Sequence, residues 1–279
     1  MLTIIEPHIH MFSRTTDEYT AMYQAGIHAC VEPSFWLGSS REYAGSFFDY
    51  FKLILEFETV RARRFGIDHY AAISLNPKEA DDPVLAKEVI AGLGKFLDHE
   101  RCIALGEIGL NNITQNEADA FAAQLHIAHE RNMLVIIHLP HFNKTKGIEW
   151  TADIVKNEGI DPNMVLIDHN TEECMKAARD TGCWTGLTVY PISKLDPVRA
   201  AALLHEYGTD RMIVSGSADW GVSDPLSLVK VADYMRSLGS KEDQIANILF
   251  GNPNRFYSQS SRWNPDFNIV PLDPKIFQR

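Results

Sequence analysis

Short apolar runs alternate with longer amphipathic stretches along this chain. Residues 133–137 are apolar at every position, which is typical of a parallel strand covered on both faces. Glycine, proline and asparagine bound this run and the other apolar runs, as expected at the ends of strands and helices. We predict eight strands, at residues 2–8, 27–31, 69–75, 102–107, 133–138, 164–168, 183–188 and 211–215.

Each predicted strand is followed by at least one segment with helical periodicity. The longest, from about Arg41 to Arg64, spaces its large apolar residues three or four apart and so forms an apolar stripe. We predict helices at residues 17–24, 41–64, 83–97, 116–131, 147–157, 171–181, 197–207, 225–238 and 241–249.

Repeated strand–helix units without a linker predict the α/β class and a closed (β/α)8 TIM barrel. The barrel forms one domain over residues 1–279, in which residues 258–279 are a tail that wraps the surface. An open doubly wound sheet is the alternative, but no glycine-rich phosphate loop follows the first strand.

Composition narrows the class of protein. The chain has 279 residues, 45% of them hydrophobic, and a net charge of −11 that argues against binding nucleic acid by phosphate neutralisation. Its four cysteines show no C-x-x-C spacing and are expected to be buried, reduced thiols. No signal-like segment and no apolar run of membrane-spanning length is present, so we expect a cytoplasmic protein without membrane partners.

Histidines and acidic residues stand at the ends of the predicted strands. His8 and His10 close the first strand, where strand alternation would point both imidazoles to one face. The residues that end or follow later strands are Glu32, Glu107, His138, Asp168, His169 and Asp219. In a TIM barrel these ends meet in one bowl, so the residues are candidate metal ligands, except that alternation would turn Asp168 away from His169. Imidazole with carboxylate suits Zn²⁺ best, with Mn²⁺, Mg²⁺, Fe²⁺ or Co²⁺ as alternatives.

These positions carry a resemblance to a known family. The segment His8-Ile9-His10, the sequence Gly-Glu-Ile-Gly-Leu at 106–110, and His138, His169 and Asp219 resemble the TatD family of the amidohydrolase-like superfamily. The resemblance covers roughly residues 2–257 and implies a metal-dependent hydrolase with two divalent cations. It implies that His8, His10 and Asp219 hold one cation, that His138 and His169 hold the other, and that Glu107 bridges both. It makes Glu107 and Asp219 the candidate catalytic residues, with Asp219 accepting a proton from the water.

Other residues at the predicted barrel mouth are candidates for binding the substrate: His141, Glu32, Trp36, Tyr190 and Trp220. The favoured hypothesis is hydrolysis of a small ester, lactone, amide or phosphoester. The alternatives are a TatD-type deoxyribonuclease that depends on Mg²⁺, a non-catalytic metal-binding partner protein, and a decarboxylase or deaminase of the same superfamily. The sequence leaves the oligomeric state open.

Overall fold

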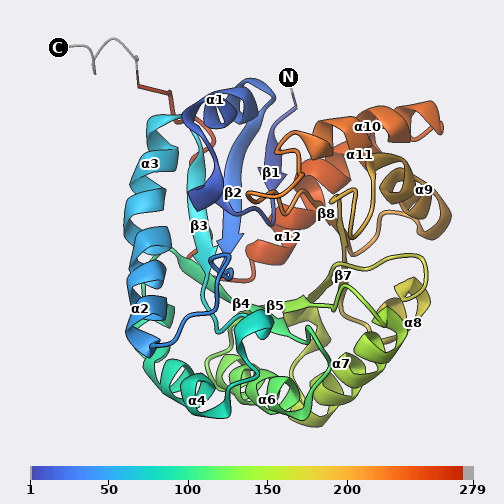
Figure 1. Cartoon of the computed structure of the whole chain (residues 1–279). Helices are drawn as coiled ribbons and strands as arrows, with labels where there is room; N and C mark the ends of the chain where they lie inside the picture. The colour runs from blue at the N-terminus through green and yellow to red at the C-terminus, as the bar shows by residue number, and fades with distance from the viewer. Residues whose placement is uncertain (1, 273–279) are drawn as a thin grey trace.

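The computed structural model describes residues 2–272, and its strands form one parallel sheet that curves into a nearly closed barrel (Figure 1). The strands are β1 Ile4–Glu6, β2 Ile27–Pro33, β3 Asp68–Ala72, β4 Cys102–Gly109, β5 Leu134–His138, β6 Val165–Asp168, β7 Trp184–Thr188 and β8 Met212–Ser215. The eight strands lie in sequence order, each paired in parallel with the next. The predicted (β/α)8 TIM-barrel architecture is therefore confirmed.

The seam between β8 and β1 is joined by loop and side-chain hydrogen bonds. The Glu6 carboxyl group accepts from the Gly216 N–H at 3.0 Å, and His10 N donates to Ala218 O at 3.0 Å. Burial raises the pKa of Glu6 to about 8. Because β1 ends at Glu6, the prediction that the strand continues to His8 is wrong. His8 and His10 are therefore positioned by hydrogen bonds across the seam to the loop after β8 and not by the alternation of a strand.

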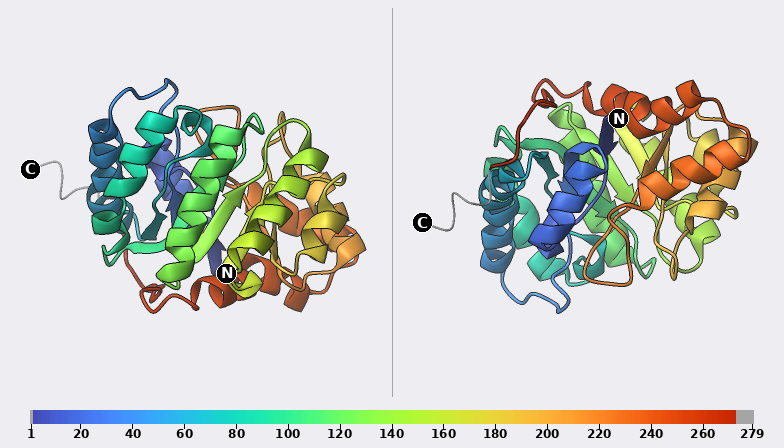
Figure 2. Two further views of the ribbon diagram at one scale, coloured as in Figure 1. Left: turned by 90° about the horizontal axis from the view of Figure 1, so that it is seen from below. Right: turned by 90° about the horizontal axis from the view of Figure 1, so that it is seen from above.

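Helices cover the outside of the strands, as the two views of Figure 2 show. The α-helices are α1 Thr16–Gln24, α2 Ala44–Lys52, α3 Glu58–Arg64, α4 Pro83–Gly92, α5 Gly94–Leu97, α6 Gln115–Glu130, α7 Lys144–Glu158, α8 Met175–Asp180, α9 Pro197–Tyr207, α10 Ser227–Ser237, α11 Glu242–Ala246 and α12 Asn252–Tyr257. Single turns of other helix types are η1 Met11–Ser13, η2 Leu53–Phe57, η3 Pro77–Glu79, η4 Pro162–Met164 and η5 Asn247–Gly251.

Several helix boundaries differ from the predicted ones. The predicted helix 83–97 is divided into α4 and α5 at Leu93, and the predicted helix 41–64 begins only at Ala44 and passes through the π-helical turn η2. The predicted helix 171–181 shortens to α8, while α12 was not predicted. Local capping explains the well-predicted starts: Asp82 accepts hydrogen bonds from the first turn of α4, and Pro83 occupies its first position.

Apolar side chains fill the barrel interior. Ile5, Ile136 and Leu166 belong to one buried cluster with Phe256 of α12 and with Trp263, which follows it. The Phe256 ring packs on Trp184, the first residue of β7. These aromatic side chains therefore close the barrel at the amino-terminal ends of the strands. At the opposite end, the carboxyl termini of the strands carry polar residues such as Glu107, His138 and Asp168.

The tail after α12 runs across the closed end. Asn264 N donates to the Tyr70 hydroxyl at 3.3 Å, and Asp266 N donates to the Asp68 carboxylate at 2.8 Å. These two residues therefore bond to β3, and the last described residue, Leu272, donates from N to Arg64 O of α3 at 2.9 Å. The rest of the predicted surface-wrapping tail, residues 273–279, lies outside the described residues. Within residues 2–272, no helix has the length and apolar character needed to cross a membrane.

Candidate metal centre

Glu107 of β4 lies among three buried imidazoles. Its Oε1 atom is 2.7 Å from His169 Nε2, 3.1 Å from His138 Nδ1 and 3.7 Å from His8 Nε2. Ligand atoms of His8, Glu107 and His169 all lie within 4.8 Å of one another. Three separate strand ends thus place two imidazole nitrogens close to one carboxylate oxygen, a combination that could ligate metal.

A bulge in β4 turns Glu107 toward this cluster. Gly106 pairs with Ile136 of β5, but Ile108 pairs with the very next residue, Ile137. Glu107 is therefore an extra residue in the ladder, and a bulge of this kind redirects a side chain relative to strict alternation. Ile108 keeps its place in the apolar layer outside the barrel.

Asp168 fixes the orientation of two of the imidazoles. Its Oδ2 atom is 2.7 Å from His8 Nδ1, and its Oδ1 atom accepts from the Thr188 hydroxyl at 2.9 Å. That hydroxyl is in turn 2.7 Å from His169 Nδ1. Because the ionised carboxylate accepts only, the Thr188 proton points to Asp168, and Thr188 must accept from His169 Nδ1–H. Both imidazoles consequently carry their proton on Nδ1 and present a lone pair on Nε2, the arrangement typical of metal-ligating histidine.

This tautomer leaves two acceptors facing each other. His169 Nε2 has a lone pair, the Glu107 carboxylate oxygen has lone pairs, and only 2.7 Å separates the two atoms. Two buried acceptors at that distance repel each other. Among the described residues, the Lys194 ammonium lies 3.3 Å from His169 Nε2 and offsets the repulsion at that atom. A divalent cation with nitrogen and oxygen ligands at about 2.0–2.2 Å would satisfy both acceptors at once.

The expectation that Asp168 points away from the site is wrong, because it rested on the wrong phase of β6. Leu166 belongs to the barrel interior, so alternation also directs Asp168 inward. His169 joins it there because the backbone turns at this residue to φ +66°. Lys144 supports the turn by donating from Nζ to His169 O at 2.6 Å. Gly186 on β7 leaves room for the carboxylate, since a Cβ at that position would lie 2.8 Å from Asp168 Cγ.

His10 and His138 carry ring nitrogens that the described protein atoms do not satisfy. Among the described residues, His10 Nδ1, His10 Nε2 and His138 Nε2 are buried without a hydrogen-bond partner. The His10 ring stacks on Phe35 with 3.8 Å between centroids, so its orientation is set by packing. Buried polar atoms without partners are costly, and these nitrogens fit a site that binds a cation.

The protonation states suit the same role. Burial lowers the pKa of His10, His138 and His169, which keeps these imidazoles neutral. Burial alone would raise the pKa of Glu107, but attraction to His8, His138 and His169 in their protonated forms, together with the hydrogen bond to His138, lowers it well below its usual range, so the carboxylate stays ionised. A carboxylate among neutral imidazoles is a donor set ready for a divalent cation such as Zn²⁺.

Asp219 follows β8 and lies beside the cluster rather than within it. Its Oδ1 atom accepts from the Tyr190 hydroxyl at 2.9 Å and from Gly221 N at 2.6 Å. Burial, together with the Asp219 carboxylate, raises the pKa of Tyr190, so the phenol keeps its proton and acts as the donor. No hydrogen bond between described residues occupies Oδ2, which leaves that oxygen available to the cavity.

The cluster opens into a small cavity of about 160 Å³ at the barrel mouth. Four of the candidate substrate residues line it: Trp36, His141, Tyr190 and Trp220. Burial lowers the pKa of His141 to about 3, so this imidazole is neutral. The lining also contains Glu107, His138, His169 and Asp219. One enclosed space thus joins the candidate ligands to an aromatic wall.

Comparison with known proteins decides the family. The family model described as TatD related DNase matches residues 5–258. The chain belongs to this family. This TatD-family protein is accordingly a metal-dependent hydrolase, and the resemblance inferred from its motifs is confirmed.

Similar proteins share its fold, and one of them is described as a metal-dependent hydrolase. The TatD-family protein is 27% identical to an uncharacterised metal-dependent hydrolase of Methanocaldococcus jannaschii, over 91% of this chain and 99% of the relative. A TatD-like protein of Archaeoglobus fulgidus has a similar structure, with a TM-score of 0.75 at 22% identity over 91% of this chain and 99% of that one. A mutant of a PTE-like lactonase of Deinococcus radiodurans shares the fold, with a TM-score of 0.62 at 17% identity over 92% and 96% of the two chains.

Glu32 does not line the cavity, so the expectation that it contacts substrate is not supported. It is fully buried behind the site, where its carboxylate lies 2.8 Å from His69 Nε2 and accepts from Phe12 N at 3.0 Å. Both carboxylate oxygens have partners, which explains why a charge is tolerated there. Glu32 instead anchors the loop that follows His10.

Sequence reasoning missed several residues of the cavity wall, including Asn76, Lys78 and Lys194. Asn76 donates to Glu107 Oε2 at 3.4 Å, and its place directly after the predicted strand 69–75 was a usable signal. Lys194 had no such signal. It enters the cavity only because the loop after β7 turns back, with Leu195 N donating to Thr188 O at 3.2 Å.

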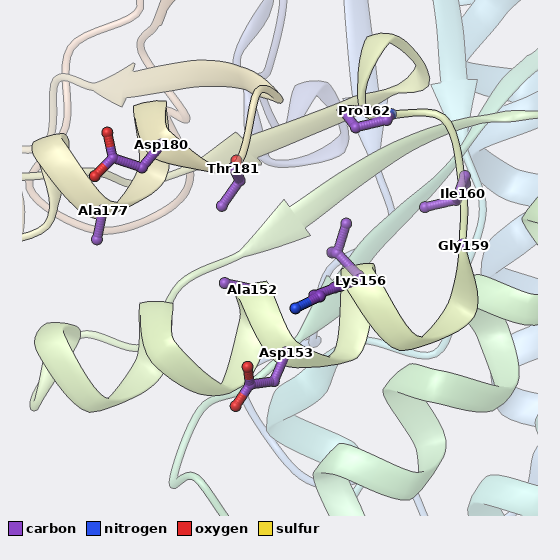
Figure 3. A pocket seen from close by; sticks show the side chains of 10 residues that line it. Ala152, Asp153, Lys156, Gly159, Ile160, Pro162, Ala177, Asp180 and Thr181 are labelled. Atoms are coloured by element: carbon purple, nitrogen blue, oxygen red, sulfur yellow. The ribbon is translucent and has the colours of Figure 1, made fainter.

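A larger groove lies elsewhere, between α7 and α8 on the outside of the barrel (Figure 3). It has a volume of about 480 Å³ and is lined mainly by small and aliphatic residues, with Asp153, Lys156 and Asp180 at its edges. It contains none of the candidate ligands. Size alone therefore does not locate the functional site, whereas the donor groups do.

Proposed function

We propose that this TatD-family protein uses two divalent cations, zinc by preference, to hydrolyse a small ester, lactone, amide or phosphoester. The observation that carries the proposal is the facing pair of acceptors, His169 Nε2 and Glu107 Oε1, separated by 2.7 Å. The unpartnered nitrogens of His10 and His138 extend the donor set to either side. A single ion would leave part of this donor set unused.

The donors divide as the family resemblance implies. We assign His8, His10 and Asp219 to one cation and His138 and His169 to the other, with Glu107 between them. Cations held there would act as Lewis acids and lower the pKa of bound water to near neutral.

The chain's own residues supply the remaining functions. The hydrogen bonds from Tyr190 and Gly221 to Oδ1 hold the Asp219 carboxylate in a fixed orientation. Its other oxygen is then placed to accept the proton that the nucleophilic water releases. Trp36 and Trp220, 5.9 Å apart at their ring centroids, form the apolar wall against which a substrate packs.

The size of the cavity supports a small substrate. Its volume of about 160 Å³ lies below the roughly 300–1,000 Å³ of typical ligand pockets. A relative that is 25% identical over 56% of this chain is an aryldialkylphosphatase of Saccharolobus solfataricus, which makes phosphoesters suitable first substrates to test. The description of the family as DNase-related supports deoxyribonuclease activity as a second candidate, against which the enclosed cavity and the −11 net charge weigh.

The test combines metal content with turnover. Metal in the purified protein is measured by plasma emission, and the zinc-loaded protein is screened against small esters, lactones, amides and phosphoesters. His8→Ala and Asp219→Ala should abolish turnover, whereas His126→Ala on the exposed face of α6 should not change it. Protein that neither binds nor is stabilised by zinc or manganese would refute the proposal. Release of nucleotides from a 3′-labelled oligonucleotide with Mg²⁺ would favour the nuclease, and metal binding without any turnover would favour a non-catalytic role.

A further inference from the structure

Lys194 places a buried ammonium group directly beside the candidate metal centre. Its side chain lies in the cavity with only 8% of its surface exposed. Among the described residues, the one hydrogen bond of Nζ goes to His169 Nε2, at 3.3 Å. A buried ammonium normally has a carboxylate partner or several acceptors. Among the described residues, Lys194 Nζ has one neutral hydrogen-bond acceptor, and its other close contact is the Tyr190 ring, whose centroid lies 5.4 Å away.

That acceptor is the same lone pair that the proposed function gives to a cation. When His169 Nε2 binds a metal, Lys194 loses its hydrogen-bond partner, and its positive charge then lies close to another positive charge. The backbone offers no escape: Lys194 N donates to Tyr190 O at 2.9 Å, and Arg199 donates to Lys194 O at 2.7 Å. The stem is therefore held over the cavity, and the ammonium group needs a new, negatively charged partner there.

The charges of the cavity wall point the same way. Its charged lining residues are two lysines, Lys78 and Lys194, and two acids, Glu107 and Asp219. The two positive and two negative charges cancel, so a divalent cation bound there would give the cavity a net positive charge. Lys78 stands on the loop after β3, and its Nζ lies 4.1 Å from the centroid of the Trp36 ring. Lys78 is exposed and Lys194 is buried, so an anionic group that entered this cavity from solvent would lie near both ammonium groups.

We propose that Lys194 is the residue that selects the substrate: it binds an anionic group, a carboxylate or a phosphate, so that the substrate of this hydrolase is a small acid rather than a neutral ester. This inference rests on the proposed function and deepens it. Lys78 supports the selection at the cavity mouth, where the neighbouring indole of Trp36 provides the packing surface.

The test measures anion binding by the zinc-loaded protein, independently of turnover. Inorganic phosphate and acetate are titrated separately by calorimetry into wild type, Lys194→Gln, Lys194→Arg and Lys146→Gln. Lys146 is the matched control because its Nζ also lies over an indole, that of Trp150 at 5.1 Å, but on the outside of α7. The stronger of the two probes identifies which anionic group the cavity prefers.

We expect Lys194→Gln to weaken binding of the preferred anion by roughly tenfold to a hundredfold, the usual effect of losing a hydrogen bond to a charged group. Lys194→Arg should retain most of the affinity, and Lys146→Gln should match wild type. Zinc content must stay unchanged in all three variants. Equal anion affinity in Lys194→Gln would overturn the inference, as would a loss of zinc in that variant. Wild type that binds no zinc at all would instead refute the proposed function, so the two failures are distinguishable.

Discussion

Replacing Asp168 by asparagine tests whether the hydrogen bonds behind the imidazoles prepare them for metal. The substitution keeps the shape of the side chain. An amide oxygen in the place of Oδ1 still accepts from Thr188 at 2.9 Å and from His169 N at 2.7 Å. The amide NH2 group then faces His8 Nδ1, which in wild type lies 2.7 Å from Oδ2.

Two donors cannot face each other at that distance, so the His8 proton must move to Nε2. Nε2 is the atom turned toward Glu107, and a protonated nitrogen does not bind metal. Loss of a partner behind a metal-ligating histidine typically costs tenfold to a hundredfold in metal affinity, or about 1.4–2.7 kcal/mol. We expect zinc affinity to fall by that amount in Asp168→Asn.

The assay is zinc titration against a competing chelator, with thermal unfolding of the metal-free proteins measured in parallel. Asp180→Asn is the control, because Asp180 is an exposed residue of α8 whose ion pair, among the described residues, is with Lys176 on the same helix. Unchanged zinc affinity in Asp168→Asn would refute the argument that Asp168 selects the tautomer of His8. Equal losses in both variants would refute it as well.

Three further predictions test the packing, the seam and the candidate base. Gly186→Ala would bring a Cβ to 2.9 Å from Asp168 Cα, a backbone contact that cannot relax. The denaturant midpoint should therefore fall by the equivalent of about 1–3 kcal/mol, and an unchanged midpoint would contradict this prediction. Burial raises the pKa of Glu6 to about 8 from 4.5, so the folded state keeps a proton that the unfolded chain releases. The free energy of unfolding of the metal-free protein should then decrease as pH rises through that interval, and Glu6→Gln should flatten the slope in urea titrations; equal slopes contradict this. Tyr190→Phe removes the 2.9 Å hydrogen bond to Asp219, so kcat should fall roughly tenfold with little change in KM, and a change confined to KM contradicts the positioning role.

Periodicity predicted the order of the eight strands because each strand is short, apolar and bounded by breaking residues, which are local properties. Helix starts were predicted where a capping residue acts within one turn, as Asp82 does for α4. Predictions failed where longer-range packing sets the boundary. β1 ends at Glu6, whose carboxyl group accepts a hydrogen bond across the seam from Gly216, 210 residues away in sequence.

The same division holds at the site. The sequence by itself determined which donors stand at strand ends, since the residue types and the strand count are both local. The tertiary structure decided which way those donors point. The bulge in β4 turns Glu107 inward, and the alternation of β6 directs Asp168 inward as well. The Glu32 carboxylate is instead paired with His69 and does not reach the cavity. It also decided that Lys194 lies beside the candidate metal centre, because the loop that carries it returns beside β7. Orientation depends on contacts between segments far apart in the chain, and a pattern of neighbouring residues does not contain them.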